Sequence, residues 1–192
     1  MQELKERIIK EGKVLPGNII KVDGFLNHRI DTDLMGRIAD EFGKHFNMDE
    51  VSVVLTAEAS GIALASILAN HFHKPMIFAK KAKSDNIEGG LYQSDIFSYT
   101  YKKKVTLLLS KEWLSADDKV LIVDDFMANG EAMRGLCDIV TAAGATLVGI
   151  GCALEKGFQG GGDRLRAAGI NLKSLAIIES AEPGNIVFRE GN

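Results

Sequence analysis

The fold is decided by the stretch Val120-Leu121-Ile122-Val123-Asp124-Asp125-Phe126-Met127-Ala128-Asn129-Gly130-Glu131-Ala132. Its apolar half predicts a strand buried on both faces, and the small residues that follow predict a turn into a helix. In a parallel sheet, ligands bind at this end of the strands. Backbone N–H groups of the turn and the positive end of the helix suit a phosphate, whereas carboxylates accept hydrogen bonds from hydroxyls. The stretch therefore predicts a site for a molecule with a diol and a phosphate, such as ribose 5-phosphate.

A simpler alternative is that Asp124 and Asp125 only end a strand and cap the next helix, because short motifs of this kind also occur by chance. A second stretch weakens this alternative. Thr56-Ala57-Glu58-Ala59-Ser60-Gly61 also follows an apolar run and precedes a helical pattern, so it predicts a second ring of backbone donors at the same sheet edge. Two such sites suit a substrate with two separated phosphate groups. Glu58 fits this interpretation if it orients the turn or approaches a metal ion.

The rest of the chain alternates short apolar runs with helical patterns. Apolar residues between Ala132 and Ala143 recur at helical intervals, for example, and predict a helix that Gly144 ends. This alternation is typical of an α/β fold with a central, mainly parallel sheet flanked by helices. The predicted strands cover residues 51–56, 75–79, 119–123 and 145–150.

A few segments depart from this rhythm. Residues 80–104 are polar and basic around a Gly-Gly pair, which predicts a long, mobile hairpin. Apolar residues from Leu34 to Phe46 predict a helix in an N-terminal unit that caps the sheet. Gly160-Gly161-Gly162 predicts a turn, and Trp113 is expected to be buried because tryptophan usually is.

Composition excludes several function classes. With 192 residues the chain fits one domain, and a net charge of −3 lacks the basic excess of nucleic-acid binders. No apolar run approaches the roughly 20 residues that cross a bilayer. The N-terminal segment lacks the pattern of a secretory signal, so we expect a cytoplasmic protein without membrane or nucleic-acid partners. The two cysteines are expected to be reduced core residues.

The segment from Val120 to Ala132 resembles the hallmark of the type I phosphoribosyltransferases, in which apolar residues, two acids and a small-residue loop follow one another. The loop of that family usually carries threonines where this chain has Asn129 and Ala132. The wider pattern is similar to that of the bacterial members that act on xanthine. It comprises the segments at residues 20–23, 25–31, 128–130 and 155–158 and extends over nearly the whole chain.

The resemblance implies a single phosphoribosyltransferase domain over residues 1–192. Residues 1–46 and 155–192 would contribute a base-binding hood, and residues 80–104 would form a flexible loop that closes over the site. It further implies a homodimer.

The resemblance also implies a role for each site residue. Asp124 and Asp125 would be catalytic and hold the ribose hydroxyls. The purine base would contact Ile20, Asn27, Lys156 and Phe158. Phosphoribosyl pyrophosphate would be bound by Ala128, Asn129, Gly130, Glu131, Ala132, Glu58, Ala59, Ser60, Lys80 and Lys81.

The implied reaction transfers the phosphoribosyl group from phosphoribosyl pyrophosphate to xanthine in purine salvage, through a transition state with oxocarbenium character. Mg²⁺ would be held by substrate oxygens, without direct side-chain ligands. One alternative is a phosphoribosyltransferase for guanine, hypoxanthine, adenine or orotate. Another is a non-catalytic regulator that senses phosphoribosyl pyrophosphate, although we find no basic helix-turn-helix unit before the sheet.

Overall fold

The computed structural model describes residues 1–81, 90–98 and 103–190. Its centre is a sheet of six strands in the order β10-β9-β8-β7-β3-β4, in which all neighbours are parallel except the edge pair β10 and β9. The predicted α/β class is therefore confirmed. The strands are β3 (Val53–Ala57), β4 (Met76–Ala79), β7 (Lys119–Met127), β8 (Thr146–Lys156), β9 (Leu172–Glu182) and β10 (Asn185–Phe188).

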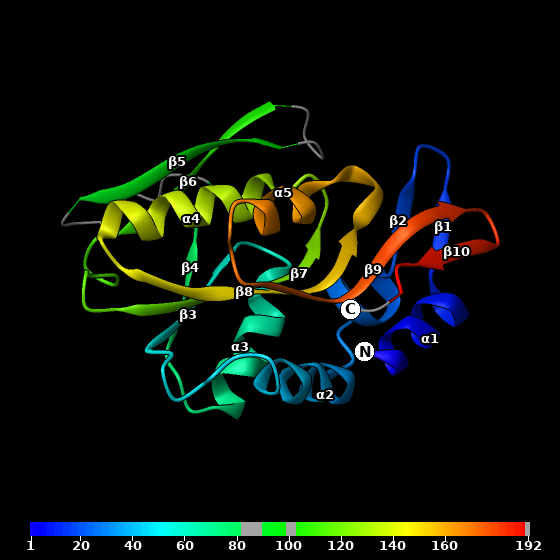
Figure 1. The fold of residues 1–192 in the computed structure, drawn as a ribbon, viewed down its shortest axis with the longest axis horizontal. Helices are drawn as coiled ribbons and strands as arrows, with labels where there is room; N and C mark the ends of the chain where they lie inside the picture. Colours follow the sequence, from blue (N-terminus) through cyan, green and yellow to red (C-terminus); the bar gives the residue numbers. More distant parts are fainter. Residues whose placement is uncertain (82–89, 99–102, 191–192) are drawn as a thin grey trace.

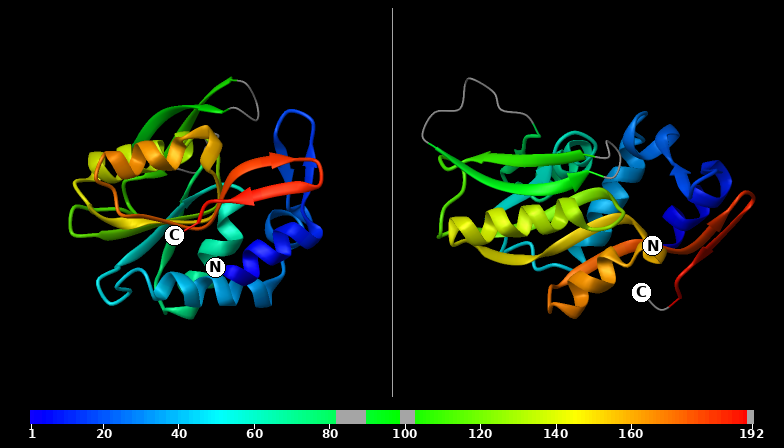
Figure 2. Two further views of the ribbon diagram at one scale, coloured as in Figure 1. Left: turned by 45° about the vertical axis from the view of Figure 1, so that its right-hand side comes forward. Right: turned by 90° about the horizontal axis from the view of Figure 1, so that it is seen from above.

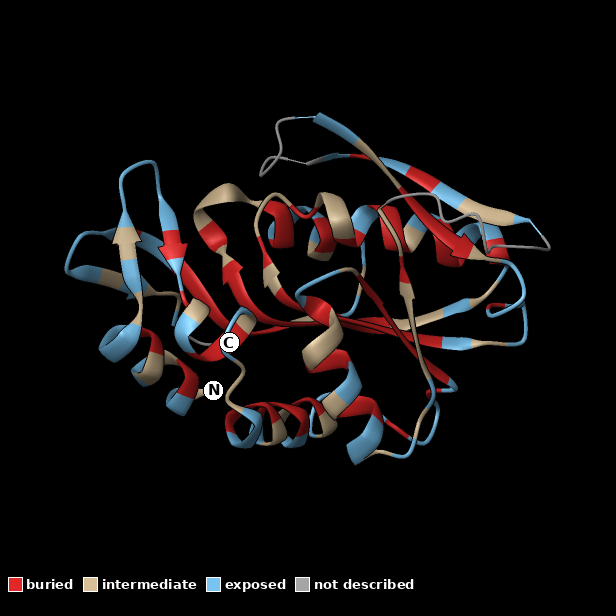
Figure 3. Ribbon diagram, turned by 180° about the vertical axis from the view of Figure 1, so that it is seen from behind, coloured by how far each residue is buried: buried red, intermediate tan, exposed pale blue. Residues whose placement is uncertain are grey.

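Helices cover both faces of this sheet. Helices α2 (Thr32–Gly43) and α3 (Gly61–His71) lie below it in Figure 1, and α4 (Glu131–Ala143) and α5 (Gly161–Ala167) lie above it. The hairpin of β5 (Leu91–Ser98) and β6 (Lys103–Ser110) packs over α4, as the view from above shows (Figure 2). The strands and the inward sides of the helices are buried, whereas exposed residues follow the outer surfaces (Figure 3).

The N-terminal segment of the chain packs against β9, near the C-terminal end of the described residues. The N-terminal segment consists of α1 (Gln2–Glu11), the hairpin of β1 (Lys13–Leu15) and β2 (Ile19–Lys21), and a π-helical turn, η1 (Asp23–Asn27). The N-terminal ammonium of Met1 donates a hydrogen bond of 2.6 Å to the carbonyl of Leu175 in β9. The ammonium of Lys5 in α1 donates a hydrogen bond of 3.5 Å to the carbonyl of Arg189, so α1 also lies beside the segment that follows β10 (Figure 1).

Local sequence signals explain where the helices begin and end. The carboxylate of Asp31 accepts a hydrogen bond of 3.0 Å from the backbone N–H of Leu34, which caps the start of α2. Gly144 has a left-handed backbone with φ of 72°, a conformation that glycine adopts readily, and it ends α4 as predicted. Apolar residues of α2 at helical spacing are fully buried: Leu34, Ile38 and Phe42.

The four predicted strands are confirmed, but two of them are longer than predicted. β7 continues through both acids to Met127, because its pairing with β8 continues to the partners Met127 and Glu155. The two acids therefore lie inside a strand and do not follow it. The predicted N-terminal helix ends at Gly43, before Phe46, which is nevertheless buried.

Two other predictions are corrected. Trp113 is 61% exposed, because it lies in the turn between β6 and β7 and no helix covers it. The glycine triplet is a turn only at Gly160, whose φ is 70°, since Gly161 and Gly162 already begin α5.

The predicted hairpin is displaced along the chain. Its paired strands run from Leu91 to Ser98 and from Lys103 to Ser110, beyond the expected end at residue 104. The predicted loop residues 82–89 and 99–102 lie outside the described residues. Both cysteines are free, and burial raises the pKa of the Cys137 thiol to about 11. No helix in the described part of the chain is long and apolar enough to cross a membrane.

The packing of α2 predicts the cost of one core substitution. The ring of Phe42 is fully buried against the sheet, and a Cβ on Gly151 of β8 would lie 3.0 Å from it. Phe42→Ala is expected to lower the free energy of unfolding by about 3–5 kcal/mol, because it leaves a cavity that the sheet cannot fill. Urea denaturation measures this, with Ile9→Ala as the control at a side chain that is 63% exposed. An equal loss of unfolding free energy in both variants would contradict the placement of Phe42 in the core.

Candidate active site

A cavity of about 360 Å³ lies at the carboxyl ends of the parallel strands. Its walls come from segments far apart in the sequence, including the N-terminal hairpin, the start of α3, the end of β7 and the end of β8. This is the edge at which the sequence predicts a ligand. The predicted site residues that line the cavity are Ile20, Asn27, Ser60, Lys81, Asp124, Lys156 and the loop residues Ala128, Asn129, Gly130, Glu131 and Ala132.

The loop at residues 128–132, here called the phosphate loop, joins β7 to α4. Gly130 has a φ of 75°, which lets the chain turn sharply into the helix. Backbone N–H groups at the start of α4 have no partner within the helix, so they can bind an anion in the cavity. The guanidinium of Arg164 donates a hydrogen bond of 3.0 Å to the Asn129 carbonyl and so holds the loop from behind.

The carboxylate of Glu131 is engaged elsewhere. It accepts hydrogen bonds from the backbone N–H of Phe97 at 3.4 Å and from the guanidinium of Arg134 at 3.2 Å. Arg134 also donates to the Asp95 carbonyl at 2.7 Å, which ties the β5–β6 hairpin to α4. Glu131 therefore offers its backbone N–H to an anion, while its side chain fastens the hairpin beside the cavity.

The two predicted catalytic acids have different environments. Asp124 lines the cavity and is 7% exposed, whereas Asp125 is fully buried and does not line the cavity. Burial, followed by the charge of Asp125, raises the pKa of Asp124 well above its usual range. Neither carboxylate oxygen of Asp125 has a hydrogen-bond partner among the described residues. Buried polar groups without a hydrogen-bond partner destabilise the folded state, and they are found at functional sites.

The predicted pyrophosphate stretch, residues 56–61, turns tightly beside Asp124. A Cβ on Gly61 would lie 2.5 Å from Oδ1 of Asp124 and 2.2 Å from Oγ1 of Thr56, so only glycine fits there. The hydroxyl of Thr56 is buried without a partner in the described structure. Ala59 and Ser60 are exposed at the tip of the turn, and Ser60 reaches the cavity.

Glu58 makes a contact of the kind that the orienting alternative for it requires. Its carboxylate accepts a hydrogen bond from the backbone N–H of Lys81, which joins the residue 56–61 turn to the end of β4. Lys81 lines the cavity, whereas Lys80 does not. The backbone of Lys80 exchanges two hydrogen bonds of 2.8 Å with Leu108 in β6. Of the two predicted lysines, Lys81 is thus the one placed at the cavity.

Three of the four predicted base contacts meet at the other end of the cavity: Ile20, Asn27 and Lys156. The ammonium of Lys156 donates a hydrogen bond of 2.9 Å to the Asn18 carbonyl and lies 5.3 Å from the ring centre of Phe126. Burial lowers the pKa of Lys156. The ammonium of Lys156 thus connects the end of β8 to the N-terminal hairpin.

The fourth predicted contact, Phe158, does not line the cavity. It packs against the core on the side of α1 to α3. Phe126, which the sequence analysis did not select, lines the cavity, as does Phe97. Strand alternation does not mark Phe126, because Val123 and Phe126 pack on one face of the sheet while Ile122 and Met127 pack on the other.

Comparison with known proteins identifies relatives of the whole chain. The family model described as "Phosphoribosyl transferase domain" matches residues 24–165. The xanthine phosphoribosyltransferase of Bifidobacterium longum (strain NCC 2705) is 51% identical over 192 residues, which covers 98% of this chain and 100% of the relative. The xanthine phosphoribosyltransferase of Lachnoclostridium phytofermentans is 50% identical over 191 residues and is covered to 98%, as is this chain.

Solved structures share the fold at lower identity. The APRTase of Giardia lamblia complexed with 9-deazaadenine has a TM-score of 0.78 and 20% identity, covering 93% of this chain and 98% of that one. The adenine phosphoribosyl transferase of Trypanosoma brucei, in complex with AMP, pyrophosphate and ribose-5-phosphate, has a TM-score of 0.73 and 20% identity. That match covers 91% of this chain and 78% of the other.

The raised pKa of Asp124 predicts a pH-dependent gain of stability in Asp124→Asn. A carboxyl whose folded pKa is above its unfolded value, about 3.9, contributes stability at lower pH that is lost as pH rises through the folded pKa. The variant should therefore match the wild type near pH 4 and exceed it by about 1–3 kcal/mol near pH 7, since it removes a buried charge.

Urea denaturation across this pH range measures the difference. Asp117→Asn is the matched control, because it makes the same substitution at an exposed aspartate just before β7. An Asp124→Asn variant that is less stable than the wild type at neutral pH would contradict the prediction.

Proposed function

The chain belongs to the phosphoribosyltransferase family, and on this premise we propose that it transfers the 5-phosphoribosyl group from phosphoribosyl pyrophosphate to xanthine, releasing pyrophosphate and forming xanthosine 5′-phosphate. One observation carries the proposal. A single cavity brings the phosphate loop and Asp124 together with the amide of Asn27 and the ammonium of Lys156. Relatives of about half identity over almost the whole chain, named for the xanthine reaction, support the choice of base.

We assign the ribose phosphate to the part of the cavity formed by the phosphate loop and Asp124. The 5-phosphate accepts hydrogen bonds from backbone N–H groups of the phosphate loop, and the carboxylate of Asp124 accepts them from the ribose hydroxyls. When the bond from ribose C1 to pyrophosphate breaks, positive charge develops on the ribose ring. A neighbouring carboxylate in a buried site stabilises that charge. The bond from C1 to a purine nitrogen then forms, and the proton of that nitrogen passes to the released pyrophosphate or to water.

The pyrophosphate group is assigned to the turn at residues 56–61. Ser60 and Lys81 face the cavity from this side, and Lys81 is held in place through the Glu58 carboxylate. Lysine is a common phosphate ligand because its ammonium acts as a compact positive charge. Glu58 would support this subsite through its carboxylate, and Ala59 and Lys80 would do so through the backbone.

The residues present fit Mg²⁺ bound together with the substrate. In the described part of the chain, no cluster of three or more histidine, cysteine or acidic residues forms a complete metal site. The ion would be held mainly by substrate oxygens and water, and the carboxylate of Asp124, which lines the cavity, offers a hard oxygen donor beside them. When bound, the ion would neutralise charge on the leaving pyrophosphate.

Base recognition is assigned to the hood end of the cavity. Xanthine presents two ring carbonyls and several N–H groups, so a lysine can donate to a carbonyl and the Asn27 amide can both donate and accept. Ile20 adds an apolar contact, and the Phe126 ring is placed to pack on the face of the base. Lys156 offers donors only, which favours an oxopurine over adenine.

We also propose that the hood consists of residues 1–46 and 155–192, as one part of a single domain. Support comes from the three base contacts, which all belong to these two segments, and from the contacts between them beside β9. The family resemblance further suggests a homodimer that acts in the cytoplasm. Light scattering of the purified chain would test the assembly.

A transfer assay with xanthine, guanine, hypoxanthine, adenine and orotate in parallel tests the function. Turnover should depend on Mg²⁺ and be fastest for xanthine. The double variant Asp124→Asn with Asp125→Asn should lose at least about 100-fold in turnover, because two groups that stabilise the transition state are neutralised. Adenine preference would overturn the base assignment, and binding of phosphoribosyl pyrophosphate without turnover of any base would favour the regulator.

A pair of leucine variants tests which aromatic ring packs on the base. Phe126→Leu should raise the KM for xanthine about three- to tenfold, because a ring contact contributes about 0.5–1.5 kcal/mol beyond its buried area. Phe158→Leu should leave that KM unchanged, because Phe158 packs in the core and not in the cavity. Steady-state kinetics at saturating phosphoribosyl pyrophosphate distinguishes the two, and the reverse result would restore the sequence-based choice of Phe158.

A further inference from the structure

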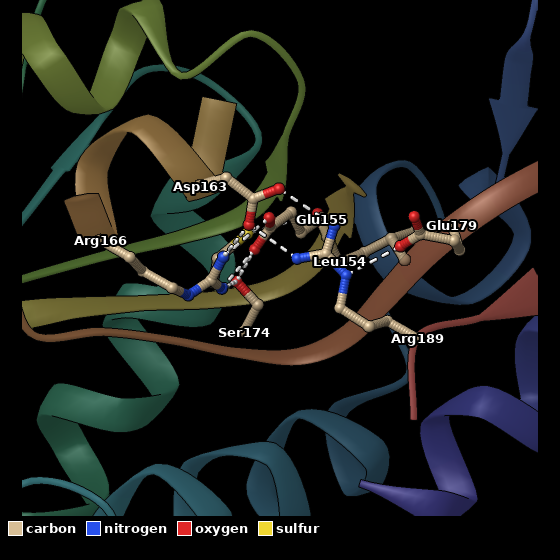
Figure 4. A network of polar contacts seen from close by, with 8 residues as sticks. Leu154, Glu155, Asp163, Arg166, Ser174, Glu179 and Arg189 are labelled. Atoms are coloured by element: carbon tan, nitrogen blue, oxygen red, sulfur yellow. Dashed lines mark hydrogen bonds and ion pairs between the residues drawn. The ribbon is translucent and has the colours of Figure 1, made fainter. Parts of the chain in front are cut away.

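The residue before Lys156 carries a buried charge that the proposed reaction does not use. Glu155 is fully buried in β8 and does not line the cavity. The guanidinium of Arg166 in α5 donates to both of its carboxylate oxygens, at 3.1 and 2.7 Å, and the hydroxyl of Ser174 in β9 donates to one of them (Figure 4). Such a two-pronged contact fixes both position and direction, because the guanidinium is planar and rigid.

The pair belongs to a larger polar network that reaches the C-terminal segment. Arg166 also contacts the carboxylate of Asp163 at 3.3 Å, and Asp163 accepts hydrogen bonds of 2.6 and 3.0 Å from Arg189. Arg189 donates in turn to Glu179 of β9 at 2.8 Å (Figure 4). The network therefore fastens α5 to β8, β9 and the segment after β10.

The first turn of α5 packs closely against this network on one side and against the phosphate loop on the other. A Cβ on Gly162 would lie 2.1 Å from Oε1 of Glu155. A Cβ on Gly161 would lie 2.5 Å from the carbonyl oxygen of Ala128 and 2.7 Å from the backbone nitrogen of Gly130. Any side chain at either glycine would therefore have to push the carboxylate or the loop backbone away.

We propose that Glu155 and Arg166 are positioning residues that set the phosphate loop, through Gly161 and Gly162, and the neighbouring Lys156 at the same time. The proposal rests on the proposed function, in which the phosphate loop binds phosphoribosyl pyrophosphate and Lys156 binds the base. Glu155 precedes Lys156 in β8, while Arg166 holds the helix whose start supports the loop. A displacement of about 1 Å in such a support can cost on the order of 100-fold in rate.

Substitution of the two glycines gives the sharper test, because a side chain at Gly161 would push on the phosphate loop and one at Gly162 would push on the Glu155 carboxylate. Gly161→Ala should raise the KM for phosphoribosyl pyrophosphate about tenfold and leave the KM for xanthine unchanged, since it pushes on the phosphate loop alone. Gly162→Ala should raise both KM values, because it displaces the Glu155 carboxylate. Gly36→Ala is the matched control, since a Cβ there meets nothing within 4 Å.

The ion pair is tested by Glu155→Gln, which keeps the shape and removes the charge. It should raise both KM values about tenfold. Its control is Glu3→Gln, because Glu3 also holds an arginine, Arg37, through both oxygens at 2.9 Å, but does so between α1 and α2 at a half-exposed position. All assays are run where circular dichroism shows each variant to be folded. Unchanged KM values together with a lowered melting temperature would mean a purely structural role and would overturn the proposal.

Calorimetric titration with ribose 5-phosphate separates this proposal from the proposed function. Gly161→Ala should weaken its binding about tenfold relative to the wild type, and Gly36→Ala should not, whether or not any base is turned over. Wild-type binding without turnover would therefore reject only the reaction. If Gly161→Ala fails to fold, Glu155→Gln provides the same titration. Equal affinity in the wild type and the folded variant, or no binding to the wild type, would overturn the positioning proposal.

Discussion

The site depends on the burial of two adjacent carboxylates at the end of the central strand β7. Asp125 is fully enclosed without a partner among the described residues, and Asp124 is almost enclosed beside it. Burial of an unpaired charge destabilises a fold, so the surroundings must be held by other interactions. β8 pairs with β7 past both acids, and Gly61 lets α3 begin directly against Asp124. The fold thus keeps two unfavourably buried carboxylates at the end of β7, and of these Asp124 faces the cavity, where the proposed function places the ribose hydroxyls.

The same strand arrangement explains how distant parts of the chain share one cavity. β7 and β8 end side by side, so the phosphate loop and Lys156 lie at neighbouring strand ends. The N-terminal hairpin approaches them because Lys156 donates to Asn18, and the terminal ammonium of Met1 binds β9. The part of the cavity near Lys156 therefore depends on contacts between the two ends of the chain, while the phosphate loop depends on the sheet and on α5, whose Arg164 donates to the Asn129 carbonyl.

The sequence predicts the parts of the molecule that follow from local periodicity. Apolar runs locate the central strands, and small residues after Asp125 locate the phosphate loop. Tertiary packing decides the rest. Phe126 and Phe97 line the cavity and Phe158 does not, but no local pattern in the sequence distinguishes the three. The exposure of Trp113 and the engagement of Glu131 with the hairpin depend on which elements come to lie beside them.

The glycine triplet shows why a composition signal can indicate a turn and miss its purpose. Gly160 does turn the chain. Gly161 and Gly162 leave room for the phosphate loop and for the Glu155 carboxylate, which approach the start of α5 from two sides.

The phosphate loop differs from that of its family, in which threonines usually stand at positions 129 and 132. A loop without those hydroxyls must bind a phosphate mainly through backbone N–H groups, whose directions are set by the backbone alone. Its affinity then depends on how firmly the backbone is held. Gly161 behind Ala128, and Arg164 on the carbonyl of Asn129, provide that support from outside the cavity.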